Sequence, residues 1–329
     1  MTAIDVRNLT KHYKVPIKQP GLLASVKSLF SQEYEEKHAV EQMSFQIEAG
    51  EIVGLLGSNG AGKTTMMKML SGILHPTSGT CSVLGYTPWE RKQEFQKSIA
   101  MIMGQKNSLW WDLPAADSFL LNKEIYDIPD KDYHETLNHM VEILDVKRLL
   151  TTPVRNLSLG ERMKMEIIAG FLHQPKVVFL DEPTIGLDLT SQYAIRDFIR
   201  TMNSQRKVTI ILTSHYMADI QELCKRVIIV NKGTKLYDGQ LSHVAEDFSD
   251  VKLISIDLER DVEDAVLASI GEVVGRDVLK VTLQVPRNEI PQAIAKLGSL
   301  PVVDVNISEI PIDRVIERTL AEGKVRVNQ

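Results

Sequence analysis

The chain has 329 residues, of which 43% are hydrophobic and 25% charged, and its formal net charge is −5. This is the composition of a globular protein long enough for two domains, without the basic excess of a nucleic-acid-binding surface. No stretch approaches the run of about 18 apolar residues that crosses a membrane, and the N-terminus lacks a signal-peptide pattern, so we expect a cytosolic protein.

The segment between Tyr13 and Val40 is longer than a simple connection between two strands. Pro16 and Pro20 interrupt it, and apolar residues then follow at helical spacing. We therefore predict an insertion over residues 16–38 with an amphipathic helix, which either packs on its own sheet or meets a partner or the bilayer surface. The apolar positions are Leu22, Leu23, Val26, Leu29 and Phe30.

A glycine-rich loop follows the apolar run Ile52–Leu56 and leads into a helical pattern. The glycines let the backbone curl so that N–H groups point at phosphate oxygens, and the helix adds the positive end of its dipole. Lys63 is expected to reach the β- and γ-phosphates of a nucleotide, and the Thr64 hydroxyl to bind Mg²⁺. The candidate nucleotide-binding residues are Gly57, Ser58, Asn59, Gly60, Ala61, Gly62, Lys63, Thr64 and Thr65.

Gln105 ends a second apolar strand pattern, and an amide at the end of a strand can reach both Mg²⁺ and an attacking water. The aromatic pair Trp110 and Trp111 follows, and such pairs usually belong to the core. Residues 115–172 then read as mainly helical.

The segment that begins at Ser158 combines a helix cap with a candidate phosphate site. Ser158 is a natural N-cap, and Glu161 three residues later completes a capping box. A helix that starts with Ser158 and Gly160 is also an anion site that can grip a γ-phosphate. The two roles are compatible, so we keep both.

Two adjacent carboxylates, Asp181 and Glu182, follow the apolar run Val177–Leu180. A carboxylate at the end of a strand can hold the Mg²⁺ of a nucleotide complex, which leaves Glu182 free to orient and polarise the attacking water. Another strand pattern ends at His215. A histidine there is usually solvated, but after this series of motifs it is a candidate sensor of the γ-phosphate.

Taken in order, these motifs resemble those of the ATP-binding subunits of ABC transporters, most of all the ATPases paired with ABC-2-type exporter permeases. Residues 57–65 are similar to the Walker A loop, residues 157–161 to the signature motif, and residues 177–182 to Walker B with its catalytic glutamate. The resemblance implies an α/β P-loop NTPase fold over residues 1–240, with a helical subdomain at about 106–172.

The resemblance also implies roles for single residues. Gln105 is similar to the glutamine of the Q-loop, Asp188 to the aspartate of the D-loop, and His215 to the switch histidine. Tyr13 resembles the aromatic residue that stacks on adenine, a contact worth about 1–3 kcal/mol per base. The aromatic pair after Gln105 falls in the segment that receives a permease helix in this family, so its tryptophans are candidate interface anchors.

The signature motif departs from the family's usual Leu-Ser-Gly-Gly-Gln at two positions. Leu159 replaces a glycine and Glu161 replaces a glutamine, whereas Ser158 and Gly160, the phosphate-facing pair, are kept. We interpret the sequence as a tolerated variant. The additional candidate nucleotide-binding residues are therefore Ser158, Leu159, Gly160, Glu161 and Asp188.

In this family two copies close head to tail around two ATP molecules with Mg²⁺, so the resemblance implies an ATPase that acts as a homodimer. Each γ-phosphate would lie between the Walker A loop of one copy and Ser158 of the other. Such an ATPase energises export by separate integral membrane permease subunits, on the cytoplasmic side of the inner membrane. The implied catalytic residues are Glu182, His215 and Gln105, and the implied Mg²⁺ ligands are Thr64, Gln105 and Asp181.

After Gly239 the pattern changes, and residues 250–329 read as a small second domain. The order βαββαβ is that of a ferredoxin-like α+β module, followed by a final helix. We expect this domain to contribute dimer contacts or stability, or to sense a ligand. Strands are predicted over 252–258, 272–276, 278–285 and 302–308, and helices over 262–270, 288–297 and 312–321.

Other functions remain open from the sequence. An insertion like that at residues 16–38 resembles one in ATPases that export polysaccharide or teichoic acid. A non-transport ABC ATPase of DNA repair would need a long coiled coil, and one of translation two cassettes, and neither pattern is present. Glu182 and His215 argue against a regulatory module without turnover. The resemblance implies that the permease, not this chain, selects the cargo.

Overall fold

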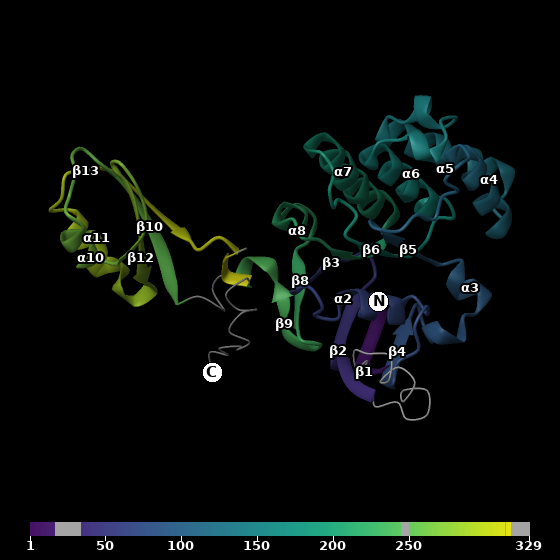
Figure 1. The fold of residues 1–329 in the computed structure, drawn as a ribbon, viewed down its shortest axis with the longest axis horizontal. Helices are drawn as coiled ribbons and strands as arrows, with labels where there is room; N and C mark the ends of the chain where they lie inside the picture. Colours follow the sequence, from purple (N-terminus) through teal and green to yellow (C-terminus); the bar gives the residue numbers. More distant parts are fainter. Residues whose placement is uncertain (17–33, 245–249, 313, 317–329) are drawn as a thin grey trace, which may run out of the picture. The chain divides into compact units, whose positions relative to one another are not determined.

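The computed structural model divides into two units, Met1–Asp238 and Gly239–Gln329 (Figure 1). Each unit has a hydrophobic core of its own. The residues that the structure describes are 1–16, 34–244, 250–312 and 314–316.

The larger unit is built on a six-stranded sheet in the order β5-β6-β7-β3-β8-β9. Neighbouring strands from β5 to β8 are parallel. Every residue of β6 and β7 is buried, which is the pattern of a parallel sheet covered on both faces. The strands are β3 (Ile52–Leu56), β5 (Ile99–Met103), β6 (Val177–Asp181), β7 (Thr209–Thr213), β8 (Arg226–Asn231) and β9 (Thr234–Gln240).

A second sheet of the larger unit has three antiparallel strands in the order β2-β1-β4. These are β1 (Thr2–Pro16), β2 (Tyr34–Glu48) and β4 (Ser78–Val83). The inner ends of β1 and β2 alternate between buried and exposed residues, as in a sheet with one solvated face.

Strands β1 and β2 pair as far as Pro16 and Tyr34. Tyr13 therefore lies within β1, opposite Lys37, although the segment from Tyr13 to Val40 was expected to connect two strands. The outer ends of both strands are exposed, so pairing there depends on backbone hydrogen bonds, which leave no hydrophobic pattern in the sequence. Both described ends of the predicted insertion, residues 16–38, are thus strand.

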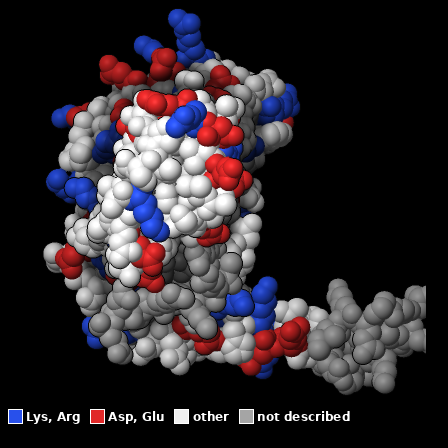
Figure 2. Space-filling model, turned by 90° about the vertical axis from the view of Figure 1, so that its left-hand side faces the viewer, with Lys and Arg blue, Asp and Glu red and all other residues white. Residues whose placement is uncertain are grey.

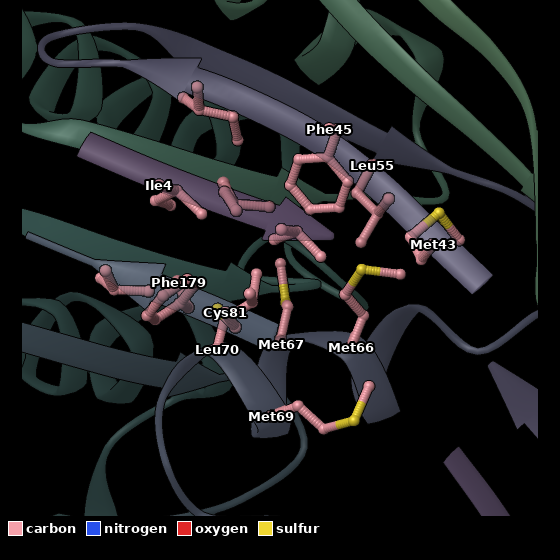
Figure 3. Close-up of a cluster of buried hydrophobic side chains, with 14 of the residues drawn as sticks. Ile4, Met43, Phe45, Leu55, Met66, Met67, Met69, Leu70, Cys81 and Phe179 are labelled. Carbon is pink, nitrogen blue, oxygen red and sulfur yellow. The ribbon is translucent and has the colours of Figure 1, made fainter. Parts of the chain in front are cut away.

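Helix α2 (Lys63–Leu70) packs between the two sheets (Figure 3). Four of its side chains are buried in a cluster that includes residues from β1, β2, β3, β4 and β6. This packing fixes the start of the helix, and with it the glycine-rich loop, at the carboxyl end of β3. The labelled members of the cluster are Ile4, Met43, Phe45, Leu55, Met66, Met67, Met69, Leu70, Cys81 and Phe179.

Helices α4 to α7 lie on the side of the parallel sheet opposite α2 (Figure 1). The stretch predicted to be helical, residues 115–172, contains α4, α5 and α6. Helix α5 buries residues three or four positions apart, the spacing of one helical face. The helices are α3 (Gln93–Gln96), α4 (Ala115–Ile125), α5 (Asp130–Leu144), α6 (Leu159–Phe171), α7 (Leu189–Arg206) and α8 (Met217–Leu223).

The smaller unit has a four-stranded antiparallel sheet in the order β11-β12-β10-β13. With a helix after β10 and another after β12, this is the ferredoxin-like fold that the sequence predicts. Alternate residues of β10 and β12 are buried against the helices. The elements are β10 (Val251–Leu258), α10 (Asp264–Ala268), β11 (Glu272–Asp277), β12 (Lys280–Pro286), α11 (Ile290–Leu297) and β13 (Val302–Glu309).

Two predicted helices fall wholly or largely outside the described residues. The amphipathic helix of residues 22–30 lies outside them, and of the final helix at 312–321 only Ile312 and residues 314–316 are described. In the described parts of the chain, every helix is too short or too polar to cross a membrane. Single 3-10 turns occur at Pro88–Glu90, Lys147–Leu149, Val154–Asn156, Leu241–His243 and Arg287–Glu289.

Candidate nucleotide-binding site

The glycine-rich loop curls around the side chain of Lys63, the first residue of α2. Its Nζ donates hydrogen bonds to the carbonyl oxygens of Gly57 at 2.7 Å and Ser58 at 3.1 Å. Gly62 has a φ of 103°, and a Cβ there would lie 2.3 Å from the carbonyl oxygen of Ala39, so this position requires glycine. The first N–H groups of a helix lack partners within it, and they form the anion site that a phosphate needs.

Two features of the site have opposite effects on the protonation of Lys63. Burial lowers the pKa of its ammonium group, while the nearby carboxylates of Glu182 and Asp181 favour the charged form. Carbonyl oxygens are its only hydrogen-bond partners among the described residues. An anionic phosphate would therefore be a stronger partner for this buried cation.

Asp181 ends β6 and joins two neighbouring elements through its carboxylate. One oxygen accepts a hydrogen bond from the Thr64 hydroxyl at 2.7 Å, and the other from the Thr213 hydroxyl at 2.7 Å. Hydroxyl and carboxylate oxygens are the ligands that Mg²⁺ prefers in proteins. The structure thus brings the predicted metal ligands Thr64 and Asp181 together, with hard oxygen donors that fit the ion.

The three predicted catalytic side chains meet at the carboxylate of Glu182. Its Oε1 lies 2.8 Å from Nε2 of His215, and its Oε2 accepts a hydrogen bond from the Gln105 amide at 3.3 Å. The Gln105 amide donates to Glu182, and among the described residues it has no hydrogen bond to the predicted metal ligands Thr64 and Asp181. The carboxylate is held from both sides and aimed by the two neighbours.

The backbone of Glu182 is in the left-handed region, with a φ of 56°. Such a conformation in a residue other than glycine costs about 1–3 kcal/mol and persists where surrounding contacts impose it. Here the Glu182 amide donates to the carbonyl and the hydroxyl of Thr213. A Cβ on Gly104 would lie 2.1 Å from the carbonyl oxygen of Glu182, so glycine is needed for β5 to approach.

A cavity of about 570 Å³ joins this cluster to the β1–β2 ribbon. Residues 59–65 and Glu182 form one part of its wall, and Tyr13 and Lys37 belong to the other. The Nζ of Lys11 lies 5.3 Å from the centre of the Tyr13 ring, within the range of a cation–π contact. The predicted adenine-stacking residue and the phosphate loop therefore face the same space.

The signature segment adopts the predicted capping box. The backbone N–H of Ser158 donates to Glu161 Oε2 at 2.8 Å, and the N–H of Glu161 donates to the Ser158 hydroxyl at 3.3 Å. A Cβ on Gly160 would lie 2.2 Å from the hydroxyl oxygen of Ser191, so α6 and α7 approach closely there. Leu159 is 39% exposed.

Asp188 caps α7 in a similar way. It accepts hydrogen bonds from the Ser191 backbone at 2.9 Å and the Ser191 hydroxyl at 2.8 Å, and these bonds lower the pKa of its carboxyl. Within the described residues, neither Asp188 nor any of residues 158–161 lines the cavity at the glycine-rich loop. The structure therefore brings together the P-loop and Walker B residues, and leaves the signature residues outside that cavity.

Trp110 and Trp111 are 52% and 48% exposed, so they are not core residues. One residue of the site, Thr213, and one buried residue outside it, Glu166, were not predicted. Thr213 is the last residue of a strand pattern, and its importance depends on β7 lying beside β6, which the sequence does not reveal. Glu166 is a buried carboxylate of α6 that gave no signal in the sequence.

The sequence patterns of two families match the chain. The pattern described as ABC transporter matches residues 40–185, and that of the C-terminal domain of EvrA-like ABC transporters matches residues 250–308. The ABC transporter ATP-binding protein NatA of Bacillus subtilis is 32% identical over 208 residues, which are 63% of this chain and 84% of NatA.

A second relative is the bacitracin transport ATP-binding protein BcrA of Bacillus licheniformis. It is 31% identical over 211 residues, which are 64% of this chain and 68% of BcrA. The solved structure of an ABC transporter ATP-binding subunit has the same fold, with a TM-score of 0.63 and 23% identity over 75% of this chain and 93% of that chain. The chain therefore belongs to the ATP-binding proteins of ABC transporters and is an ATPase.

Proposed function

We propose that this ATPase energises export by a separate ABC-2-type membrane permease, to which it attaches at the cytoplasmic face of the inner membrane. Similarity to a bacitracin transport protein supports an exporter. The net charge of −5 gives no reason to propose a nucleic-acid partner, and acidic and basic side chains are interspersed on the face shown in Figure 2.

The proposal for catalysis rests on one observation, the meeting of Gln105 and His215 at the carboxylate of Glu182. In this proposal Glu182 accepts a proton from the attacking water, because it is the carboxylate that both neighbours aim. His215 and Gln105 hold it in that position. Lys63 and the N–H groups of the glycine-rich loop bind the β- and γ-phosphates, and Tyr13 stacks on the adenine.

Thr64 and Asp181, with Gln105 as the third predicted ligand, would hold Mg²⁺. The hydrogen bond between Thr64 and Asp181 keeps two oxygen donors side by side at the end of β6. When bound, Mg²⁺ would neutralise charge on the β- and γ-phosphate oxygens. Thr213 fixes the second carboxylate oxygen of Asp181, and so orients the ligand from behind.

The position of the signature residues supports a head-to-tail homodimer. Ser158, Gly160 and Asp188 lie outside the cavity of their own chain, so a γ-phosphate that they contact would be bound to a second copy. In that arrangement the exposed side chain of Leu159 lies in the contact between the copies. ATP then belongs to the interface, so it favours the closed dimer and hydrolysis releases it.

A group of exposed apolar residues between Trp110 and Ile125 supports contact with a permease. It contains both tryptophans after Gln105 and several residues of α4, and aromatic residues of this kind are common binding anchors. We propose that this surface receives the permease and that the smaller unit adds dimer contacts or stability. The exposed apolar residues are Trp110, Trp111, Leu113, Leu120, Leu121 and Ile125.

The function is tested with Glu182→Gln in the complete complex with its membrane permease. The glutamine keeps the shape of the side chain but cannot accept the proton, so we expect phosphate release to fall about 10²–10⁴-fold. ATP binding should persist, and light scattering with ATP should show a long-lived dimer. Glu142→Gln, which changes an exposed carboxylate on α5, is the control and should leave phosphate release unchanged.

Normal phosphate release by Glu182→Gln would remove Glu182 from the role of base. The coupling to a permease would be contradicted if the isolated wild-type chain released phosphate at the same rate with and without its membrane permease. Identifying the membrane protein that co-purifies with the chain decides whether the partner is of the ABC-2 type.

A further inference from the structure

Two histidines and one glutamate face one another on the β1–β2 ribbon. His12 of β1 and His38 of β2 are paired across the strands, and their ring centres are 4.0 Å apart. Oε1 of Glu41 lies 2.5 Å from Nε2 of His12 and is also hydrogen-bonded to Nδ1 of His38. One carboxylate oxygen is therefore shared by two imidazole nitrogens.

The three side chains offer a recognisable set of metal ligands. One ligand atom from each of His12, His38 and Glu41 lies within 4.8 Å of the other two, and among the described residues no other group of three His, Cys, Asp or Glu side chains meets this condition. Two imidazole nitrogens and one carboxylate oxygen form a ligand set typical of Zn²⁺ sites that keep a fourth position open.

The distances fit an ion after a small movement. Around a tetrahedral Zn²⁺ with bonds of about 2.1 Å, the ligand atoms lie about 3.4 Å apart. The shared oxygen of Glu41 is closer than this to His12, so it must withdraw by about 1 Å, within reach of a side-chain rotation. The Glu41 side chain is 27% exposed and His38 is 52% exposed, so both can move and a hydrated ion has access.

A further carboxylate orients one of the histidines. The second ring nitrogen of His12, Nδ1, lies 3.4 Å from Oε1 of Glu36. Metal-bound histidines almost always donate this other N–H to a carboxylate, a carbonyl or a water, which fixes the tautomer and aims the ring. With Glu36 holding Nδ1, the Nε2 of His12 is left to face Glu41 and His38.

The cluster is distinct from the nucleotide cavity. His12 and Glu41 line a separate cavity of about 420 Å³, whereas the adjacent residues Tyr13 and Lys37 line the nucleotide cavity. No side chain of the three belongs to both. An ion here would link β1 to β2 directly beside the residue proposed to stack on adenine.

We propose that His12, His38 and Glu41 bind one Zn²⁺ ion, and that Glu36 orients His12 from outside the coordination shell. The ion cross-links the outer part of the β1–β2 ribbon, where the strands are exposed and few apolar side chains hold them together. This is a metal site of the protein that is separate from the Mg²⁺–ATP site.

The test is calorimetric titration of the full-length chain with Zn²⁺ alone, after removal of any histidine tag and treatment with chelator. We expect one ion per chain. His12→Asn and His38→Asn should each weaken binding at least about a hundredfold, and Glu36→Gln about 10–100-fold, the effect of losing an orienting partner. His134→Asn, which changes an exposed histidine on α5, is the matched control and should bind like the wild type.

A second measurement separates this site from the nucleotide site and from misfolding. Co²⁺ in place of Zn²⁺ should give tetrahedral absorption bands that His12→Asn abolishes, while ATP binding by the same variant shows that it is folded. Equal Zn²⁺ affinity of the wild type and both histidine variants would overturn the proposal. So would loss of the ion in His215→Asn but not in His12→Asn, which would place it beside Glu182.

Discussion

At Glu182 the two carboxylate oxygens have different partners, His215 on one and Gln105 on the other. The orientation of the Glu182 carboxylate therefore depends on both neighbours. Removing one of them should leave the carboxylate in place but with a less fixed orientation towards the attacking water. Effects of such groups on the rate of hydrolysis are non-additive, because each acts through the same carboxylate.

For His215→Ala we expect kcat for ATP hydrolysis to fall about a hundredfold, while the affinity for ATP stays within about threefold. Among the described residues the histidine pairs with Glu182 and has no hydrogen bond to the loop residues that hold Lys63, so ATP binding and hydrolysis should respond differently to this change. Single-turnover phosphate release and nucleotide titration measure the two quantities. His139→Ala on α5 serves as the control. Weaker ATP binding at unchanged kcat would show that His215 binds nucleotide instead.

Single residues of the site were predictable where a short motif determines the local geometry. The roles proposed for Lys63 and Thr64 follow from their place in one contiguous loop. Thr213 was not predictable, because its two hydrogen bonds to neighbouring Walker B residues require knowledge of which strands are adjacent. Gln105 was expected near both Mg²⁺ and the attacking water, and its amide donates a hydrogen bond to Glu182. The sequence could not predict this partner, because a long side chain can adopt several rotamers.

At the scale of elements, α6 is tied to the segment that follows β5 through Glu166. The buried carboxylate accepts hydrogen bonds from the backbone N–H groups of Ser108 and Leu109 and from the Ser108 hydroxyl. The helix that begins with the signature motif is thereby linked to the Q-loop. We therefore expect this carboxylate to couple the positions of the two elements.

Glu166→Gln should change the pH dependence of stability. Burial raises the pKa of Glu166, although the hydrogen bonds from Ser108 and Leu109 oppose this, so the folded state holds the proton more tightly than the unfolded state. The wild type should therefore lose stability as pH rises above the ordinary glutamate pKa of about 4.3. The variant lacks that loss, so its stability relative to wild type should increase as pH rises above about 4.3.

Urea unfolding followed by tryptophan fluorescence measures this effect. All three tryptophans, Trp89, Trp110 and Trp111, belong to the larger unit, so the signal reports on the unit that contains Glu166. Parallel pH profiles for the wild type and Glu166→Gln would contradict the role of burial at this carboxylate.

The strands of the smaller unit were predictable to within one or two residues, because Ile254, Ile256 and Leu283 belong to strict apolar alternations. Helix α10 is shorter than the predicted 262–270, since its chain turns into β11 after Ala268. The outer β1–β2 ribbon was missed, because Glu35 and Lys37 are exposed and leave no such alternation.

At the scale of the whole molecule, the order of strands decides which motifs meet. Strand β7 lies between β6 and β3, and all three are parallel. Lys63, Asp181 and His215 therefore lie together at the carboxyl ends of these strands, although they are far apart in the chain. The motifs identify the ingredients of the site, but nothing in the sequence gives this order. The fold of the larger unit was predicted from its resemblance to a family. The apolar patterns alone predict single strands and helices but not their order in the sheet.

Leu159→Asp should prevent pairing of two copies with ATP. A carboxylate at this exposed apolar position would be buried between the copies near triphosphate, and like charges there are strongly unfavourable. We expect a monomer in light scattering with Mg²⁺–ATP and a loss of hydrolysis, with ATP binding to a single copy retained. Ile73→Asp, at an exposed apolar position outside the signature segment, is the control. Pairing by Leu159→Asp would contradict the proposed dimer.

The left-handed backbone at Glu182 has a consequence for engineering this protein. Glycine or asparagine adopts a left-handed backbone more readily than glutamate does. Either substitution at Glu182 would remove about 1 kcal/mol of backbone strain and raise the melting temperature. The same exchange would discard the proposed proton acceptor. Durability and turnover are thus opposed at this one position, and a hardier catalyst has to gain its extra stability elsewhere in the chain.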